Sequence, residues 1–149
     1  MSFTITQEQI IDYIKDGNLK KIKFLKEFGY DFTQKNMFIV LASGYGHLEI
    51  VKYFVDECGC DPKVGNNRPI EIAAFYGYLE IVKYLIEECE CDPEIARKYT
   101  TNEKIIEYLD SLKEEVEQNK TNVKEQSETN TKEQIKTKLN EILELLNQN

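Results

Sequence analysis

Apolar residues in the middle of the chain follow two short helical runs with a glycine between them. The runs lie on either side of Gly77, and their apolar positions are Ile70, Ala73, Ala74, Leu79, Val82, Leu85 and Ile86. Spacings of three and four residues place these side chains on one face of each helix. Gly77 can adopt the positive φ that a tight bend requires. The pattern therefore predicts an antiparallel pair of short helices.

The same pattern occurs twice at a fixed distance. Residues 46–53 read GHLEIVKY, and residues 77–84 read GYLEIVKY, 31 positions later. When residues 37–62 are aligned with residues 68–93, 15 of 26 positions are identical, and both copies end in Cys-x-Cys-Asp-Pro. A fixed period of this length indicates a fold of stacked repeats.

Fainter copies stand on both sides of these two. The earlier copy has Gly17, Leu19, Ile22, Leu25 and Asp31 where the next has Gly46, Leu48, Val51, Phe54 and Asp61. The later copy lacks the glycine and has Ile95, Ala96, Tyr99, Ile105, Ile106, Tyr108 and Leu109. Lys21 replaces Ile50 and Ile81, and Lys104 lies in the last second helix, as expected where a terminal repeat presents polar surface. We expect about four repeats in residues 1–112, with the first and last acting as caps.

The sequence changes character after residue 112. Residues 113–134 contain only two apolar residues, Val116 and Val123, and are predicted to form a flexible or loosely helical linker. Residues 135–149 are predicted to form an amphipathic helix, whose apolar stripe is Ile135, Leu139, Ile142 and Leu146. Three roles fit this stripe: docking onto the last repeat, self-association, or binding another protein.

Together these residues resemble the ankyrin repeat family. The positions that match the family pattern are Ala42, Gly46, His47, Val51, Phe54, Asp61, Pro69, Ala73, Ala74, Gly77, Val82, Leu85 and Asp92. The period of 31 is shorter than the family's 33, and the segment between Asp61 and Pro69 is correspondingly short. Met37 and Phe38 replace the usual Thr-Pro start of the first helix. The short period is similar to that of ankyrin proteins from giant DNA viruses of amoebae.

The resemblance implies an all-α solenoid of stacked antiparallel helix pairs that binds other proteins and has no catalytic residues. In this family, the concave surface of the first helices and the loops leading into them hold the partner. The resemblance places on that surface the residues Tyr45, Phe75 and Tyr76, and in the loop the residues Lys63, Asn66, Asn67 and Arg68. Clustered aromatic residues are favoured as binding anchors, and packing or simple solvation is the alternative. We expect a protein–protein interaction module; a scaffold that oligomerises through the C-terminal helix is the alternative function.

Charge and composition narrow the range of partners. The net charge is -8, and phosphate binding needs basic surface, so no nucleic acid partner is expected. The chain starts without a basic segment followed by an apolar run, and no stretch is apolar enough to span a bilayer. These features predict an intracellular, cytoplasmic protein, located in the host cytoplasm if it is viral. One helix face is basic and fits either a capping role or an acidic partner; its lysines are Lys20, Lys21, Lys23 and Lys26.

The four cysteines form two Cys-x-Cys pairs, Cys58 with Cys60 and Cys89 with Cys91. Equivalent positions in stacked repeats lie about 8 to 10 Å apart, which is too far for a disulfide or for four thiolates around one zinc ion. We expect buried thiols that end the second helices, and zinc binding is the less favoured alternative. His47, the only histidine, is expected to make structural hydrogen bonds at the interhelical turn, as in the family. No metal, cofactor or catalytic residue is predicted.

Overall fold

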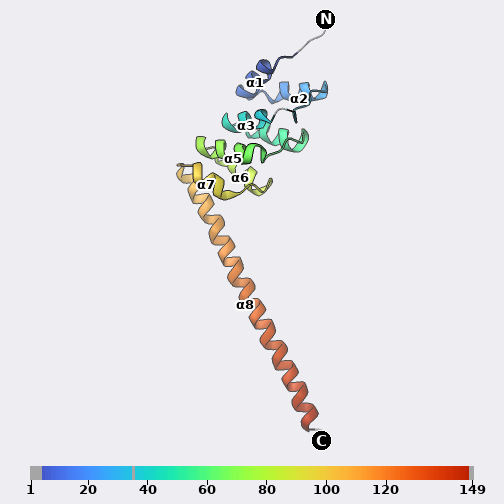
Figure 1. Cartoon of the computed structure of the whole chain (residues 1–149). Helices are drawn as coiled ribbons and strands as arrows, with labels where there is room; N and C mark the ends of the chain where they lie inside the picture. Colours follow the sequence, from blue (N-terminus) through green and yellow to red (C-terminus); the bar gives the residue numbers. More distant parts are fainter. Residues whose placement is uncertain (1–4, 35, 148–149) are drawn as a thin grey trace. The chain divides into compact units, whose positions relative to one another are not determined.

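The computed structural model describes residues 5–34 and 36–147, without the side chains of residues 119–130 and 142–147. Within these residues the regular secondary structure is helical, and no strand occurs. The all-α prediction is confirmed. The chain divides after Leu109 into a repeat body and a C-terminal body, and Figure 1 colours both along the sequence.

Pairs of short helices make up the described part of the repeat body. The helices are α1 (Gln7–Lys15), α2 (Leu19–Glu27), α3 (Met37–Gly44), α4 (Leu48–Lys52), η1 (Tyr53–Glu57), α5 (Val64–Tyr76), α6 (Leu79–Glu87), α7 (Pro93–Tyr99) and α8 (Glu103–Asn147). Repeat 1 consists of α1 and α2, repeat 2 of α3, α4 and η1, repeat 3 of α5 and α6, and repeat 4 of α7 and the start of α8. The helix η1 is a π-helical continuation of α4.

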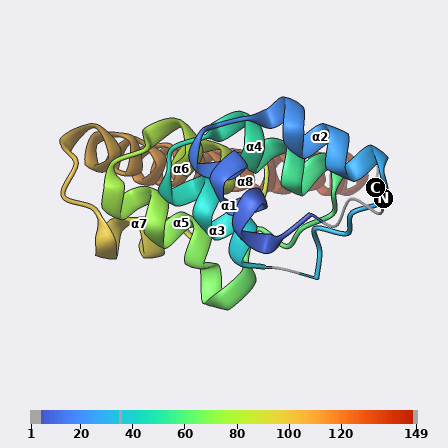
Figure 2. The same ribbon diagram turned by 90° about the horizontal axis from the view of Figure 1, so that it is seen from above.

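The helices of repeats 1 to 3, with α7, form two rows. The first helices pack side by side in the order α1, α3, α5 and α7, and the second helices α2, α4 and α6 pack in the same order beside them (Figure 2). Each of the first three pairs also packs within itself. Two layers of helices therefore enclose the core, which is the arrangement that the repeated pattern predicted.

The core is built from equivalent positions in successive repeats. Ile50 and Ile81 hold the same place in α4 and α6, and each is 1% exposed. Between repeats 1 and 2 the ring of Phe32 lies 6.0 Å from that of Phe38 and 5.2 Å from that of Phe54. All three phenylalanines are fully buried. Burial of apolar area at each junction between repeats stabilises the stack.

The interhelical glycines allow close approach between repeats. Gly46 and Gly77 have φ values of 78° and 81°, as the predicted tight bends require. A Cβ atom on Gly46 would lie 2.5 Å from the ring of Tyr78, and one on Gly77 would lie 2.8 Å from Nδ2 of Asn102. In both cases the residue that follows the bend in one repeat packs on the glycine of the repeat before it.

His47, which follows the bend in repeat 2, likewise packs on the glycine of the repeat before it. A Cβ atom on Gly17 would lie 2.8 Å from the imidazole ring of His47. Its Nε2 atom is hydrogen-bonded to the carbonyl oxygen of Lys15 at 2.8 Å. The predicted structural role of His47 at the interhelical turn is confirmed.

The segment that leads into repeat 3 forms a left-handed turn. Gly65, Asn66 and Asn67 have φ values of 61°, 61° and 64°, so the right-handed part of α5 begins at Arg68. Asparagine tolerates this conformation better than most residues because its short polar side chain can bond locally. Pro69 suits the first helical turn because its φ is already fixed near the helical value. The short spacing thus produces a compact turn.

Helix α8 runs from repeat 4 into the C-terminal body. Residues 113–134, predicted as a linker, are helical throughout and continue directly into residues 135–147. The predicted boundaries of the linker and terminal helix stay predictions. Ile135 and Leu139 are 62% and 56% exposed, whereas the side chains of Ile142 and Leu146 lie outside the described residues.

The two lysines predicted as marks of terminal repeats differ in their surroundings. Lys21 is exposed, whereas Ile50 and Ile81 at the same position are each 1% exposed, as expected if Lys21 lies on the outer face of the stack that the described residues form. Lys104 corresponds instead to Glu80, which is exposed in an internal repeat. Lys104 therefore does not distinguish a cap, because this position of the second helix is polar inside the stack as well.

Candidate protein-binding surface

The three aromatic residues predicted as anchors lie at the C-terminal ends of first helices. Tyr45 follows α3 directly, and Phe75 and Tyr76 are the last two residues of α5. Their exposed fractions are 42%, 62% and 59%. The rings of Phe75 and Tyr76 meet edge to face, with their centroids 5.1 Å apart. These three residues are called the aromatic group below.

Tyr78 connects the two halves of the aromatic group. Its ring lies 6.3 Å from that of Tyr76 and packs on Gly46, the neighbour of Tyr45 in the sequence. Because α3 and α5 also lie side by side, the structure brings the aromatic group together at one end of two adjacent first helices. Aromatic side chains held in this way lose little conformational freedom when a partner binds.

Tyr99 was not among the predicted site residues, although it extends the same row. It is the last residue of α7 and is 36% exposed. The sequence carried a signal, since Tyr99 in the faint fourth repeat corresponds to Tyr76 in the third.

The four polar candidates lie at the start of α5 and are called the loop group below. Arg68 forms an ion pair with Glu71, one turn further along the helix. The side-chain oxygen of Asn67 is buried and has no hydrogen-bond partner among the described residues. The backbone of Asn66 and Asn67 is left-handed. This conformation by itself favours asparagine at both positions, without a role in binding. Lys63 is exposed.

The structure separates the predicted site into these two groups. Arg68 and Tyr76 lie at opposite ends of the right-handed part of α5, about 12 Å apart along the helix axis at 1.5 Å per residue. Between them, Glu71 and Ile72 are half-buried. A partner that contacts both groups must therefore lie along the whole of α5.

The second helices carry a different regular arrangement, in which a lysine of one repeat lies over a tyrosine of the next. The pairs are Lys23 with Tyr53 at 5.4 Å, Lys52 with Tyr84 at 5.7 Å and Lys83 with Tyr108 at 5.7 Å from ammonium to ring centroid. Such cation–π contacts contribute about 0.5 to 1 kcal/mol at exposed sites. They join neighbouring repeats along the row of second helices.

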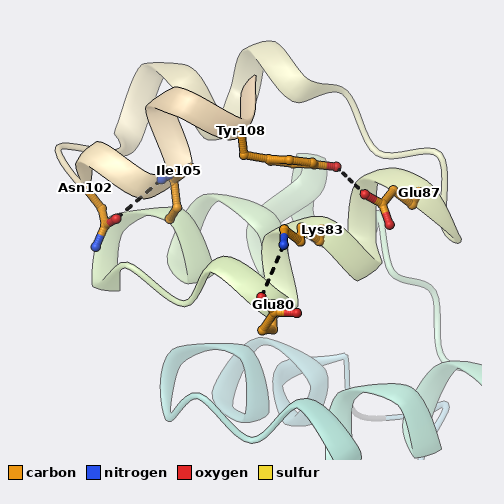
Figure 3. A network of polar contacts seen from close by, with 6 residues as sticks. All are labelled: Glu80, Lys83, Glu87, Asn102, Ile105 and Tyr108. Carbon is orange, nitrogen blue, oxygen red and sulfur yellow. Dashed lines mark hydrogen bonds and ion pairs between the residues drawn. The ribbon is translucent and has the colours of Figure 1, made fainter. Parts of the chain in front are cut away.

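Hydrogen bonds reinforce this arrangement. The hydroxyl of Tyr84 donates to Oδ1 of Asp56 at 2.8 Å. The hydroxyl of Tyr108 donates to Oε1 of Glu87, also at 2.8 Å (Figure 3). Burial, the hydrogen bond to Asp56 and nearby negative charge raise the pKa of Tyr84. Tyr84 is 8% exposed. The tyrosines of the second helices therefore serve packing between repeats.

The cysteines end the second helices as predicted, with Cys58, Cys60 and Cys91 buried and Cys89 half-buried. Burial is the main cause that raises the pKa of Cys60 to about 12 and that of Cys91 to about 11. Burial also raises the pKa of Cys58 and Cys89. Zinc binding requires the thiolate, which these surroundings disfavour.

Two further features are absent from the described residues. No cluster of three or more histidine, cysteine, aspartate or glutamate side chains in this part of the chain is placed to hold a metal ion. No helix of the same residues combines the length and the apolar character needed to cross a membrane.

Antiparallel helix pairs stacked in two rows define the class: an α-helical repeat solenoid. The family model for ankyrin repeats, in three copies, matches residues 10–97. The chain therefore belongs to the ankyrin repeat family, whose members are generally protein–protein interaction modules and typically not enzymes. No curated protein and no solved structure matches the chain.

Proposed function

We propose that this protein binds another protein through its first-helix surface, with the aromatic group as the anchor and the loop group as a polar rim. The observation that carries the proposal is the exposure of Phe75 and Tyr76, 62% and 59%, on a helix whose Ala73 and Ala74 are fully buried. The anchors are thus held by a rigid base. Exposed aromatic clusters of this kind supply much of the binding free energy at interfaces.

The test is affinity purification with mass spectrometry on two full-length baits. One is the wild type, and the other carries Tyr45→Ala, Phe75→Ala and Tyr76→Ala. We expect a partner that the wild type captures and the triple variant loses. Circular dichroism must show that the variant keeps its helix content, because loss of the fold would also remove the partner.

A matched control carries Phe24→Ala and Phe28→Ala, which remove two exposed rings from α2, 51% and 74% exposed. It should retain the partner captured through the aromatic group. If the triple variant captures the same proteins as the wild type, the aromatic group is not the binding site.

A second candidate function is assembly through the C-terminal helix. Its supporting observation is that Ile135 and Leu139 lie one turn apart and are both exposed. Exposed apolar residues at this spacing form the contact seam of paired helices. Light scattering should then give a dimer for the full chain and a monomer for the Ile135→Lys/Leu139→Lys variant. An unchanged mass would rule out assembly through these residues.

The remaining expectations about the partner belong to the same proposal. A net charge of -8 opposes binding to nucleic acid and to anionic membranes. We also propose an intracellular, cytoplasmic location, where free thiols persist. Fractionation of cells that express the tagged chain tests the location.

A further inference from the structure

Two phenylalanine rings are exposed side by side on α2. Phe24 is 51% exposed and Phe28, at the C-terminal end of the helix, is 74% exposed. Their ring centroids lie 4.4 Å apart. An exposed aromatic pair of this kind is costly in water and marks a candidate contact surface.

The position of Phe24 in the repeat explains its exposure. It corresponds to Tyr53 and Tyr84 in the next two repeats. The rings of these tyrosines lie beneath lysines of the repeat before them, at 5.4 Å and 5.7 Å. Among the described residues, the second helix that packs on α2 is α4 of the following repeat, and no other second helix lies against α2. Phe24 thus occupies a place that a neighbouring helix covers in the rest of the stack.

Lys21 supports the same interpretation. The corresponding residues in repeats 2 and 3, Ile50 and Ile81, are each 1% exposed. Lys21 is exposed, and its ammonium lies 5.9 Å from the ring centroid of Tyr13. A helix placed against α2 would therefore meet phenyl rings together with a lysine.

The charge of α2 is opposite to that of the whole chain. Its nine residues contain four lysines and one glutamate, whereas the chain has a net charge of -8. A shallow hollow of about 420 Å³ lies along one side of this helix. Its walls are Leu19, Lys20, Lys23, Phe24 and Glu27. Basic and apolar groups thus share one face.

We propose that this face, formed by Lys20, Lys21, Phe24 and Phe28 and called the α2 end surface, binds an acidic amphipathic helix of another protein. The apolar side of that helix packs on the two phenyl rings, and over Phe24 it takes the place of a preceding second helix, whereas Phe28 lies at a position that is exposed in the other repeats, as Glu57 and Glu88 are. Its carboxylates pair with Lys20 and Lys21. Phenylalanine lacks the hydroxyl that Tyr84 donates to Asp56. Phe24 therefore needs no hydrogen-bond partner, and an apolar side chain of the bound helix can cover it completely.

Charge also favours an acidic helix over a second copy of the chain as the partner of the α2 end surface. Two of the exposed apolar residues of the described C-terminal helix, Ile135 and Leu139, have lysines one turn away. These are Lys132, Lys136 and Lys138. They would face the lysines of α2, and like charges repel.

A lipid surface is less suitable than an acidic helix. Lys23 already lies over Tyr53, and Glu27 forms part of the hollow, so few cations remain for phospholipid headgroups. Stable membrane attachment by charge requires a larger cluster of basic residues. The net charge of -8 adds repulsion from anionic lipid.

The test uses the full chain and a fluorescent synthetic helix with leucines at every third and fourth position and glutamates elsewhere. Fluorescence anisotropy should show binding that weakens as salt increases. A peptide with lysines in place of the glutamates should not bind. We expect Phe24→Ser/Phe28→Ser and, separately, Lys20→Glu/Lys21→Glu to weaken binding about tenfold or more.

The matched control is Phe75→Ser/Tyr76→Ser, which removes two exposed aromatic rings from the other row of helices. It should bind the acidic peptide as the wild type does, which separates this site from the aromatic group. Failure of the acidic peptide to bind, equal binding of the lysine peptide, or an unchanged affinity after Phe24→Ser/Phe28→Ser would each overturn the proposal.

Two further measurements identify the other occupants. Sedimentation of phosphatidylserine vesicles with the wild type, but not with Phe24→Ser/Phe28→Ser, would assign the face to lipid and overturn the proposal. A solution mass that falls from dimer to monomer in the same variant would assign it to a second copy, with the same consequence. We expect neither result.

Discussion

Glu90 occupies a backbone conformation that suits glycine. Its φ is 53°, and the preceding repeat has Gly59 at the same position with a φ of 70°. A side chain in the left-handed region costs about 1 to 2 kcal/mol, while glycine costs about 0.5 to 1 kcal/mol through the entropy of the unfolded chain. We expect Glu90→Gly to raise the free energy of unfolding by about 0.5 to 1 kcal/mol, measured by urea denaturation.

Gly59→Ala is the matched control for this prediction. A Cβ atom at Gly59 would meet no atom within 4 Å, so its cost comes from the backbone alone. It should lower stability by about 1 kcal/mol. A lower stability for Glu90→Gly would mean that the Glu90 side chain contributes more than its conformation costs.

The buried thiols predict how stability depends on pH. Burial raises the pKa of Cys60 to about 12 and that of Cys91 to about 11, from the ordinary value of 9.0. Above pH 9 the unfolded chain loses these protons while the folded chain keeps them, which favours unfolding. This contribution is complete below pH 9 and is lost as the pH rises toward 11 and 12. Urea denaturation between pH 8 and pH 11 should show the fall.

The variant Cys60→Ala/Cys91→Ala isolates the thiols from other groups that titrate in this range. It should be less stable at pH 8, because buried atoms are removed, but its stability should fall less steeply with pH. Equal slopes for variant and wild type would show that the thiols do not contribute.

At the scale of the elements, the contact between interhelical turns is the most specific feature. A Cβ atom on Gly46 would meet the ring of Tyr78 at 2.5 Å and would also be strained by the φ of 78°. We expect Gly46→Ala to lower the free energy of unfolding by roughly 2 to 4 kcal/mol. Gly59→Ala introduces the same backbone strain without a steric clash. The difference in unfolding free energy between Gly46→Ala and Gly59→Ala therefore measures the clash with Tyr78.

A double-mutant cycle tests this cause. Tyr78→Ala removes the ring, so the steric part of the Gly46→Ala cost should disappear in the Gly46→Ala/Tyr78→Ala double variant. The two substitutions should then cost less together than the sum of their separate costs, as measured by urea denaturation. Strict additivity would mean that the turns of repeats 2 and 3 are not coupled.

At the scale of the whole repeat body, stability depends on neighbours. Leu85 in repeat 3 is fully buried, whereas Leu25, at the same position in repeat 1, is half-buried. We expect Leu85→Ala to cost about 2 to 5 kcal/mol and Leu25→Ala distinctly less. Calorimetry checks the order, and amide exchange should be faster in repeat 1, which contacts one other repeat among the described residues, than in repeats 2 and 3, which each contact two.

Phe75→Ala provides the comparison for Leu85→Ala within one repeat. Its ring is 62% exposed, so its removal should change the melting temperature little. If Phe75→Ala lowers the melting temperature as much as Leu85→Ala does, Phe75 contributes to packing and not to a binding surface.

The sequence by itself determined the helix pairs, the order of the repeats and the positions that face the core. This was possible because a stack buries the same positions in each repeat. Periodic apolar residues therefore indicate both where a helix lies and which of its faces packs on the next repeat. The duplicated segment, in which Ile50 matches Ile81, gave the strongest support to the prediction of stacked repeats. Exposure of Tyr45, Phe75 and Tyr76 also followed from their place in the repeat.

Only the tertiary structure decided which residues meet across repeats. The packing of Tyr78 on Gly46, the separation of the aromatic group from the loop group, and the exposure of Phe24 depend on distances between segments remote in sequence. The sequence analysis also did not predict the left-handed turn at Asn66 and Asn67, or that α8 continues as one helix through residues 113–134. The physical reason is that local pattern reports which face of a helix is apolar, whereas the atoms that cover that face belong to other helices.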